Sequence, residues 1–194
     1  MLSSKATGWS LTMGFVTLAI LMVAGMLGSN SGEPAEEVAW AAASNDWQLI
    51  LPIQMLGGCT MLIFVAGMIS WIRSIDESHA ALTYASYFPL LCLVLSWVGI
   101  ISGGAGYDMA ADNTEAANAL MQLSAMSGFM GVVMMMFSFF LVGTTAYLKK
   151  SGTPALMGLL GLGGIAGAAL CLAGVGFIGV MLVFPLNLIL VAII

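Results

Sequence analysis

The stretch TEAANALMQLSAMSGFMGVVMMMFSFFLVGTTAYLKK, residues 114–150, sets a pattern that the rest of the chain repeats. It carries no charged residue from Ala116 to Leu148, while an acid precedes this run and two lysines follow it. About 20 consecutive, mainly apolar residues suffice for a helix to cross the hydrocarbon core of a bilayer. The stretch therefore predicts one membrane-spanning helix with an acidic beginning and a basic end.

The composition extends this conclusion to the whole chain. Hydrophobic residues make up 61% of the 194 residues and charged residues 7%, whereas soluble domains carry about 25% charged residues. No segment is both long and polar enough for a soluble domain, so we expect an all-α integral membrane protein with short loops. Its residues 1–194 should form one membrane domain. Only four residues are basic, which argues against nucleic-acid binding and leaves the lipid bilayer as the expected partner.

The apolar runs predict a bundle of six transmembrane helices. The last two share one uncharged run, Ala155 to Ile194, which as a single helix would be about 60 Å long. Since the hydrocarbon core is only about 30 Å thick, this run must fold back, and residues 173–176 are the expected turn. Five helices plus a half-inserted segment are the alternative. The expected spans are about 9–28, 47–71, 80–102, 116–148, 155–173 and 177–194.

The loop between the first two spans is expected to contain a short surface helix. Pro34 suits the first turn of a helix, and Glu36 and Glu37 suit its N-terminal dipole. In this helix, Val38 and Trp40 are the apolar residues expected to enter the membrane interface.

The charges predict how the chain is threaded. With six helices, all four basic residues fall on one side and seven of the nine acids on the other. Lysine and arginine mark the cytoplasmic side of membrane proteins. We therefore expect a multi-pass protein of a plasma membrane, of the bacterial inner-membrane type, with both termini in the cytoplasm. The basic residues are Lys5, Arg73, Lys149 and Lys150.

The helix expected at 116–148 carries small residues on one narrow face. Successive residues turn by about 100° around a helix, which brings five small residues together. Small residues let helix backbones approach closely in a membrane, so we expect this face to point inward. The five residues are Ala117, Ser124, Gly128, Gly131 and Ser138.

The helix expected at 155–173 has two overlapping pairs of small residues. Gly163 and Gly167 form a GxxxG pair, and Gly164 with Ala168 repeats the spacing one residue later. Such pairs are typical of closely packed membrane helices. We therefore expect this helix to be the most closely packed in the bundle.

Methionines lie roughly opposite the small residues of the 116–148 helix. Met126, Met130 and Met134 recur every four residues, and soft thioethers select Cu(I). This MxxxM spacing, with a GxxxG pair elsewhere, resembles eukaryotic copper-uptake channels. Those channels have three helices and Met-rich outer tails, whereas six helices and no such tail are expected here. We therefore interpret the stripe, together with Phe137, as an outward-facing packing surface that binds no copper.

Few polar side chains lie within the expected spans, and three amides are candidates for ligand binding. They are Gln54, Gln122 and Asn187. Interhelical hydrogen bonds are the alternative use of such groups. Pro89 and Pro185 each remove a backbone hydrogen bond and so free the carbonyl groups of Ala85 and Met181.

No Asp, Glu, Lys, Arg or His lies within an expected span, although such residues commonly mark functional sites in membranes. We therefore expect no catalytic residue, no cofactor and no metal, and a protein that is not an enzyme. Outside the spans, Asp108, Asp112 and Glu115 would share a face if their loop were helical. They could then hold Ca²⁺, although a solvated acidic edge is the preferred interpretation.

These features favour a non-catalytic function. Close-packing glycines and short loops predict an accessory or structural subunit of a larger membrane complex, assembled with other membrane chains or as a homo-oligomer. The prolines in two helices favour an alternative, a small transporter or channel for an uncharged or apolar solute. A pocket at Pro89 or Pro185 would favour transport.

Overall fold

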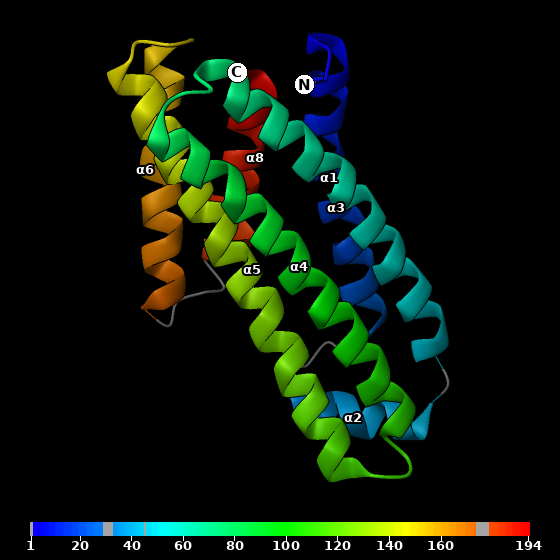
Figure 1. Cartoon of the computed structure of the whole chain (residues 1–194). Coiled ribbons are helices and arrows are strands. Elements are labelled where there is room, and N and C mark those ends of the chain that lie inside the picture. Colours follow the sequence, from blue (N-terminus) through cyan, green and yellow to red (C-terminus); the bar gives the residue numbers. More distant parts are fainter. Residues whose placement is uncertain (1, 29–32, 45, 174–178) are drawn as a thin grey trace.

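All regular secondary structure in the described part of the chain is helical. The computed structural model describes residues 2–28, 33–44, 46–173 and 179–194 (Figure 1). Five helices among these residues are long and apolar enough to cross a membrane, which confirms the all-α membrane fold. They are α1 (Ser4–Leu27), α3 (Trp47–Ile75), α4 (Ala80–Met109), α5 (Thr114–Leu148) and α6 (Pro154–Leu172).

Helices α1 and α5 each begin at a side-chain cap. The Ser3 hydroxyl accepts a hydrogen bond from the Ala6 amide at 3.2 Å, and Asn113 Oδ1 accepts one from the Ala116 amide at 3.1 Å. Each bond satisfies a donor that the first turn of a helix leaves free. The short helix α2 (Pro34–Ala43) begins at Pro34, as expected.

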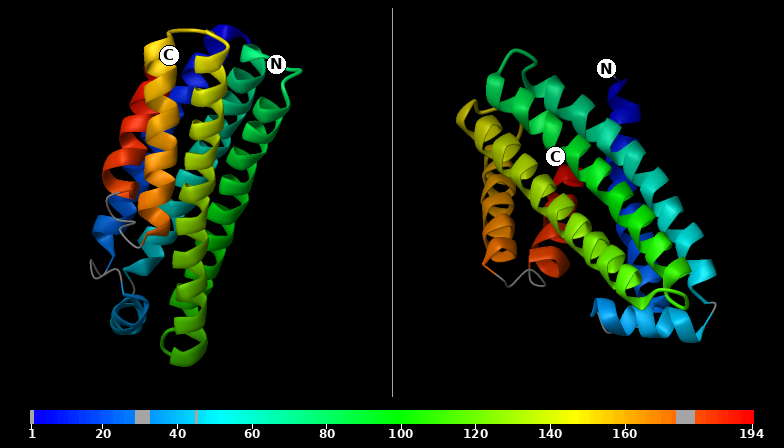
Figure 2. Two further views of the ribbon diagram at one scale, coloured as in Figure 1. Left: turned by 90° about the vertical axis from the view of Figure 1, so that its left-hand side faces the viewer. Right: turned by 60° about the horizontal axis from the view of Figure 1, so that its bottom comes forward.

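The helices α4 and α5 form the centre of the bundle and make its most extensive contact. Helices α1 and α3 pack together on one side of this pair, and α6 packs against α5 on the other (Figure 1). Both termini lie at one end of the bundle, and α2 lies across the other end with the α4–α5 turn (Figures 1 and 2). The chain thus passes back and forth as expected, while the assignment of the cytoplasmic end stays a prediction.

The C-terminal segment is shorter than a full span. A π-helical turn, η1 (Gly179–Val183), leads directly into α8 (Phe184–Ile193). Together they reach about 22 Å at 1.5 Å per residue, compared with the ~30 Å hydrocarbon core. This arrangement is closer to the alternative of five helices plus a half-inserted segment than to six full spans. The expected turn begins at Ala173, directly after α6, and its residues 174–176 lie outside the described residues.

The carbonyl group that Pro89 frees is used to join two helices. The Ser138 hydroxyl of α5 donates a hydrogen bond of 2.8 Å to the Ala85 carbonyl of α4. A second hydroxyl of α5, that of Ser124, donates to the Gly99 carbonyl of α4, also at 2.8 Å. Unsatisfied backbone groups are costly in a membrane, so these bonds stabilise the contact between α4 and α5.

The closest approach between helix backbones joins α5 and α6. A Cβ atom placed on Gly143 of α5 would lie 2.6 Å from the Met157 carbonyl oxygen of α6. A Cβ placed on Gly164 would lie 2.7 Å from the Met136 carbonyl oxygen of α5. The close packing of α6 thus has the expected physical basis, but Gly143 and its neighbour Gly161 were not anticipated.

The remaining glycines singled out by spacing have different surroundings. Gly163 faces the Asn187 side chain of α8, and Gly167 faces the flexible end of Met136. Gly131 lies against the Cys92 carbonyl of α4, within the expected inward face. A Cβ placed on Gly128 would have no side chain or neighbouring helix within 4 Å, although the Gly128 amide nitrogen lies 3.7 Å from a Cβ placed on Gly99 of α4.

The methionine stripe of α5 was expected to face outward, but only part of it does. Met126 is 62% exposed, but Met130, Met134 and Phe137 are half-buried, and the Phe137 ring lies 6.1 Å from that of Phe88. The methionine stripe faces outward only at Met126, because Met134 and Phe137 pack against the buried core of the bundle.

Val38 and Trp40 were expected to enter the membrane interface, but they contact the protein instead. Val38 is 1% exposed and packs in a cluster with Ala117 and Met121 of α5. Trp40 packs on the edge of the same cluster, against Tyr107. Helix α2 is therefore docked on the bundle by its apolar face.

Candidate functional site: a cleft beneath helix α2

The short C-terminal segment packs in only one half of the bundle, the half near the chain termini. Near the termini, α8 lies between α1 and α5, with Leu188 against Gly14 and the Phe184 ring 6.1 Å from that of Phe139. Helices α6 and α8 do not extend to the end where α2 lies (Figure 2). A cleft is present in that half, lined by the C-terminal part of α1 and the N-terminal part of α5.

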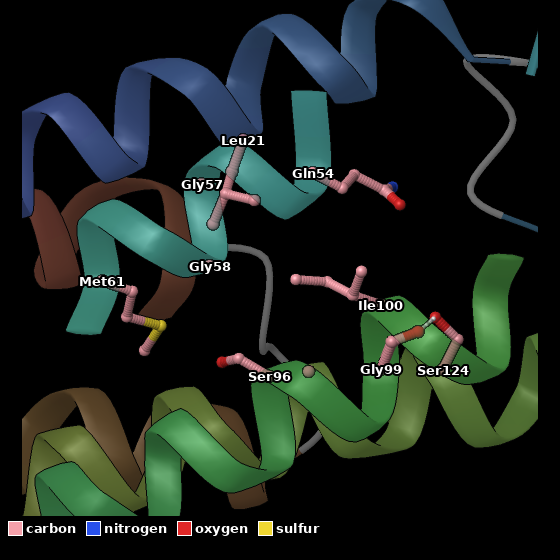
Figure 3. Close-up of a pocket in the computed structure, with 10 residues that line it drawn as sticks. Leu21, Gln54, Gly57, Gly58, Met61, Ser96, Gly99, Ile100 and Ser124 are labelled. Carbon is pink, nitrogen blue, oxygen red and sulfur yellow. Dashed lines mark hydrogen bonds between the residues drawn. The ribbon is translucent and has the colours of Figure 1, made fainter. Parts of the chain in front are cut away.

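The inner lobe of the cleft lies between α3 on one side and α4 and α5 on the other (Figure 3). Its volume is about 190 Å³. Small residues dominate its lining, and none of the lining side chains is ionisable. The polar groups are the Gln54 amide and the hydroxyls of Ser96 and Ser124. The small lining residues are Gly57, Gly58, Gly99 and Gly128.

The outer lobe lies under α2 and adjoins the inner one, because Gln54 and Ser124 line both. Its volume is about 220 Å³. Gly103 of α4 and Met121 of α5 also line it. Unlike the inner lobe, it contains a carboxyl group, that of Glu37, and a phenol, that of Tyr107.

Glu37 and Tyr107 form a pair that aromatic packing holds in place. The Tyr107 hydroxyl donates a hydrogen bond of 3.3 Å to Glu37 Oε2. The Tyr107 ring stacks on Trp47 with centroids 6.1 Å apart, and Trp40 meets it edge-on at 6.2 Å. Burial raises the pKa of the Glu37 carboxyl, and the bond from Tyr107 opposes this shift. The carboxylate therefore lies in a partly desolvated position at the mouth of the cleft.

The opposite end of the bundle carries the charges that link its loops. Lys149 forms an ion pair with Asp76, which joins the turn after α5 to the turn after α3. The hydrogen bond from Lys149, together with two from Ser78, lowers the pKa of Asp76. This exposed pair contributes little to stability, but it lies on the end where the sequence predicts every basic residue.

The structure does not bring the three predicted amides together. Gln54 is half-buried and lies between the two lobes of the cleft. Gln122 is exposed. Asn187 is 1% exposed and donates to Met136 Sδ at 3.4 Å, in the half that α8 fills. Neither Pro89 nor Pro185 lines the cleft.

The acids weighed as a Ca²⁺ site do not share one helical face. Asp108 lies in α4, Asp112 in the turn and Glu115 in α5, because the loop is not a continuous helix. Within the described ranges, no group of three or more His, Cys, Asp or Glu is arranged to hold a metal ion.

Glu37 and Tyr107 were not predicted as site residues from the sequence, because both lie in the loops between the expected spans. A sequence pattern that could have pointed to the cleft lies on α4. Gly99, Gly103 and Gly106 recur there at helical spacing just before Tyr107. That pattern predicts a narrow face without bulky side chains.

No protein-family model matches the chain, and searches of curated proteins and of solved structures find no similar protein. The class of the protein is therefore described from its own fold and cleft. It is a multi-pass, all-helical, membrane-type protein with a two-lobed cleft covered by an amphipathic helix.

Proposed function

We propose that the protein is a non-catalytic carrier or transporter that binds a small, mainly apolar molecule in the cleft. The observation that carries this proposal is the cleft itself, which is open next to Gly128 and lined by glycines and a few uncharged polar groups. Binding sites for small molecules combine such apolar walls with a small number of polar groups that orient the ligand.

The size of the cleft favours a small molecule over a helix of another protein. The two lobes, of about 190 and 220 Å³, together fall within the ~300–1,000 Å³ range of small-molecule sites. An α-helix with its side chains is about 10–12 Å across, which is too wide for a cleft of this volume. A slim molecule lying along the glycines would fill it.

The polar lining of the inner lobe favours an uncharged group at that position. Gln54, Ser96 and Ser124 offer amide and hydroxyl groups but no compensating charge. An unpaired charge buried there would lose its hydration without an ionic partner. We therefore favour the transporter alternative, with an uncharged, mainly apolar part of the solute in the inner lobe.

An accessory role in a larger complex stays a prediction. Its main support was the close spacing of glycines in α6, yet Gly164 contacts α5 of the same chain. The glycine pairs are thus used within the bundle and do not themselves indicate a partner. Co-purification distinguishes the two roles.

The test is gentle purification from the native membrane, followed by mass spectrometry of bound small molecules and of bound proteins. The variant Gly128→Phe should fill the cleft without meeting the backbone, because the space next to Gly128 is open. Wild-type protein should carry about one lipophilic molecule per chain, and the variant should lose it.

Gly8→Phe is the matched control, since Gly8 also has open space beside it and lies on α1 at the far end from α2. It should keep the bound molecule. Equal recovery from wild type and Gly128→Phe would contradict binding in the cleft, and a stoichiometric protein partner without a small molecule would favour the accessory role.

A further inference from the structure

The outer lobe of the cleft has a chemical character that the inner lobe lacks. Its Glu37 carboxyl is half-buried, and only one of its oxygens, Oε2, has a hydrogen-bond partner among the described residues. No Lys, Arg or His lines either lobe. A partly desolvated carboxylate without a cation nearby favours a positively charged ligand group.

The four basic residues of the chain are too far away to supply this charge. Lys5 lies in the first turn of α1, Arg73 in the last turn of α3, and Lys149 and Lys150 after α5. All of these helix ends lie at the end of the bundle opposite α2 (Figure 1). Glu37 therefore has no intramolecular ionic partner in the described structure.

The pair of Glu37 and Tyr107 is held in a fixed position. Trp47 stacks on the Tyr107 ring and Trp40 contacts its edge, while Val38, next to Glu37, is buried against α5. A group fixed in this way loses little conformational freedom when a ligand binds. The second oxygen of Glu37, Oε1, is then available to accept from a donor in the outer lobe.

Resting on the proposed function, we infer that the ligand is a lipophilic amine, with its ammonium group at Glu37 and its apolar tail along the glycines of the inner lobe. The two lobes meet at Gln54 and Ser124, so the head and tail of one molecule can occupy both. The acidic mouth disfavours a carboxylate of the same length through repulsion by Glu37.

The experiment compares three probes with the same eight-carbon tail: octylammonium, octanol and octanoate. Each is titrated into the purified full-length chain in nanodiscs of neutral lipid, and tryptophan fluorescence reports binding, since Trp97 borders the inner lobe through its contact with Gly58. Octylammonium should bind at least about tenfold more tightly than octanol, as expected for a charge-assisted hydrogen bond. Octanoate should bind most weakly.

Glu37→Gln should remove the preference for octylammonium over octanol. Glu36→Gln is the matched control, because Glu36 is the exposed neighbour on the same helix, and it should keep the preference. Equal binding of the amine and the alcohol to wild type, or an undiminished preference in Glu37→Gln, would overturn the inference while the proposed function stands. Failure of all three probes to bind would instead contradict the proposed function.

Discussion

Replacement by alanine should change the free energy of unfolding by different amounts at three glycines that lie in similar small-residue patterns. Gly128, Gly164 and Gly167 all lie in small-residue patterns, yet a Cβ atom meets very different surroundings at each. At Gly164 it would lie 2.7 Å from the Met136 carbonyl oxygen and 2.9 Å from Phe140 Cα. Ordinary contacts of carbon atoms are about 3.5–4.0 Å, so Gly164→Ala must push α6 away from α5.

The expected magnitudes follow from these contacts. Overpacking of this kind costs about 1–3 kcal/mol, so Gly164→Ala should lower the free energy of unfolding by that amount. At Gly167 the Cβ would meet the thioether end of the buried Met136 side chain, at 2.7 Å from its Sδ, and a flexible side chain shifts at lower cost than a backbone. Gly128→Ala meets nothing within 4 Å and should gain up to about 1 kcal/mol from better helix propensity.

The assay is equilibrium unfolding in mixed micelles, with helix content and tryptophan fluorescence followed together. The predicted order of stability is Gly128→Ala above wild type, Gly167→Ala close below wild type, and Gly164→Ala lowest. If Gly128→Ala were as destabilising as Gly164→Ala, the open cleft at Gly128 would not exist, and the site built on it would be wrong.

Three further results are expected. Ser138→Ala should lower the free energy of unfolding by about 0.6 kcal/mol, the average for interhelical hydrogen bonds in membranes, and by at most about 1.7 kcal/mol, because the Ala85 carbonyl loses its partner. Ser127→Ala, whose hydroxyl bonds within its own helix, is the control and should cost less. Burial raises the pKa of Glu37 above 4.5, so the folded state binds more protons than the unfolded state between the two pKa values. Ligand-free wild type should therefore gain thermal stability as pH falls through that window. The difference in stability between wild type and Glu37→Gln should show this trend, and a difference that is constant with pH would contradict it. In a background without native cysteines, single cysteines at the exposed positions of α2, such as Ala35 and Ala39, and in the turn at 110–113 should react with an impermeant thiol reagent on intact cells. Labelling only at 149–153 would invert the topology.

The membrane fold was predictable because its signals are long and redundant. The run from Ala116 to Leu148 lacks charge over more than a full span, and Pro34 marks the first residue of α2. Pro89 predicted a free carbonyl at Ala85, and the structure supplies its partner, Ser138. Each of these inferences depends on chemistry within one helix or on the thickness of the bilayer.

The details of packing were less predictable because they depend on which helices become neighbours. Spacing alone grouped Gly128 with Gly164, although one borders a cleft and the other an adjacent backbone. Glu37 was read as a helix-dipole residue, and its pairing with Tyr107 joins residues 70 positions apart. The cleft lies in the half of the bundle that α6 and α8 do not reach (Figure 2), a tertiary arrangement that no local pattern records.

The central claim, a small-molecule cleft next to Gly128, is tested most directly by the reactivity of a cysteine at that position. Gly128→Cys, in a background without Cys59, Cys92 and Cys171, is treated with a membrane-soluble maleimide in nanodiscs. The buried comparison is a chain that keeps Cys92 as its single cysteine, since Cys92 is 2% exposed and needs no substitution in the packed core. We expect rapid labelling at 128, slow labelling at 92, and protection of position 128 alone by octanol. Labelling at 128 that is as slow as at 92, or that octanol leaves unchanged, would contradict the cleft.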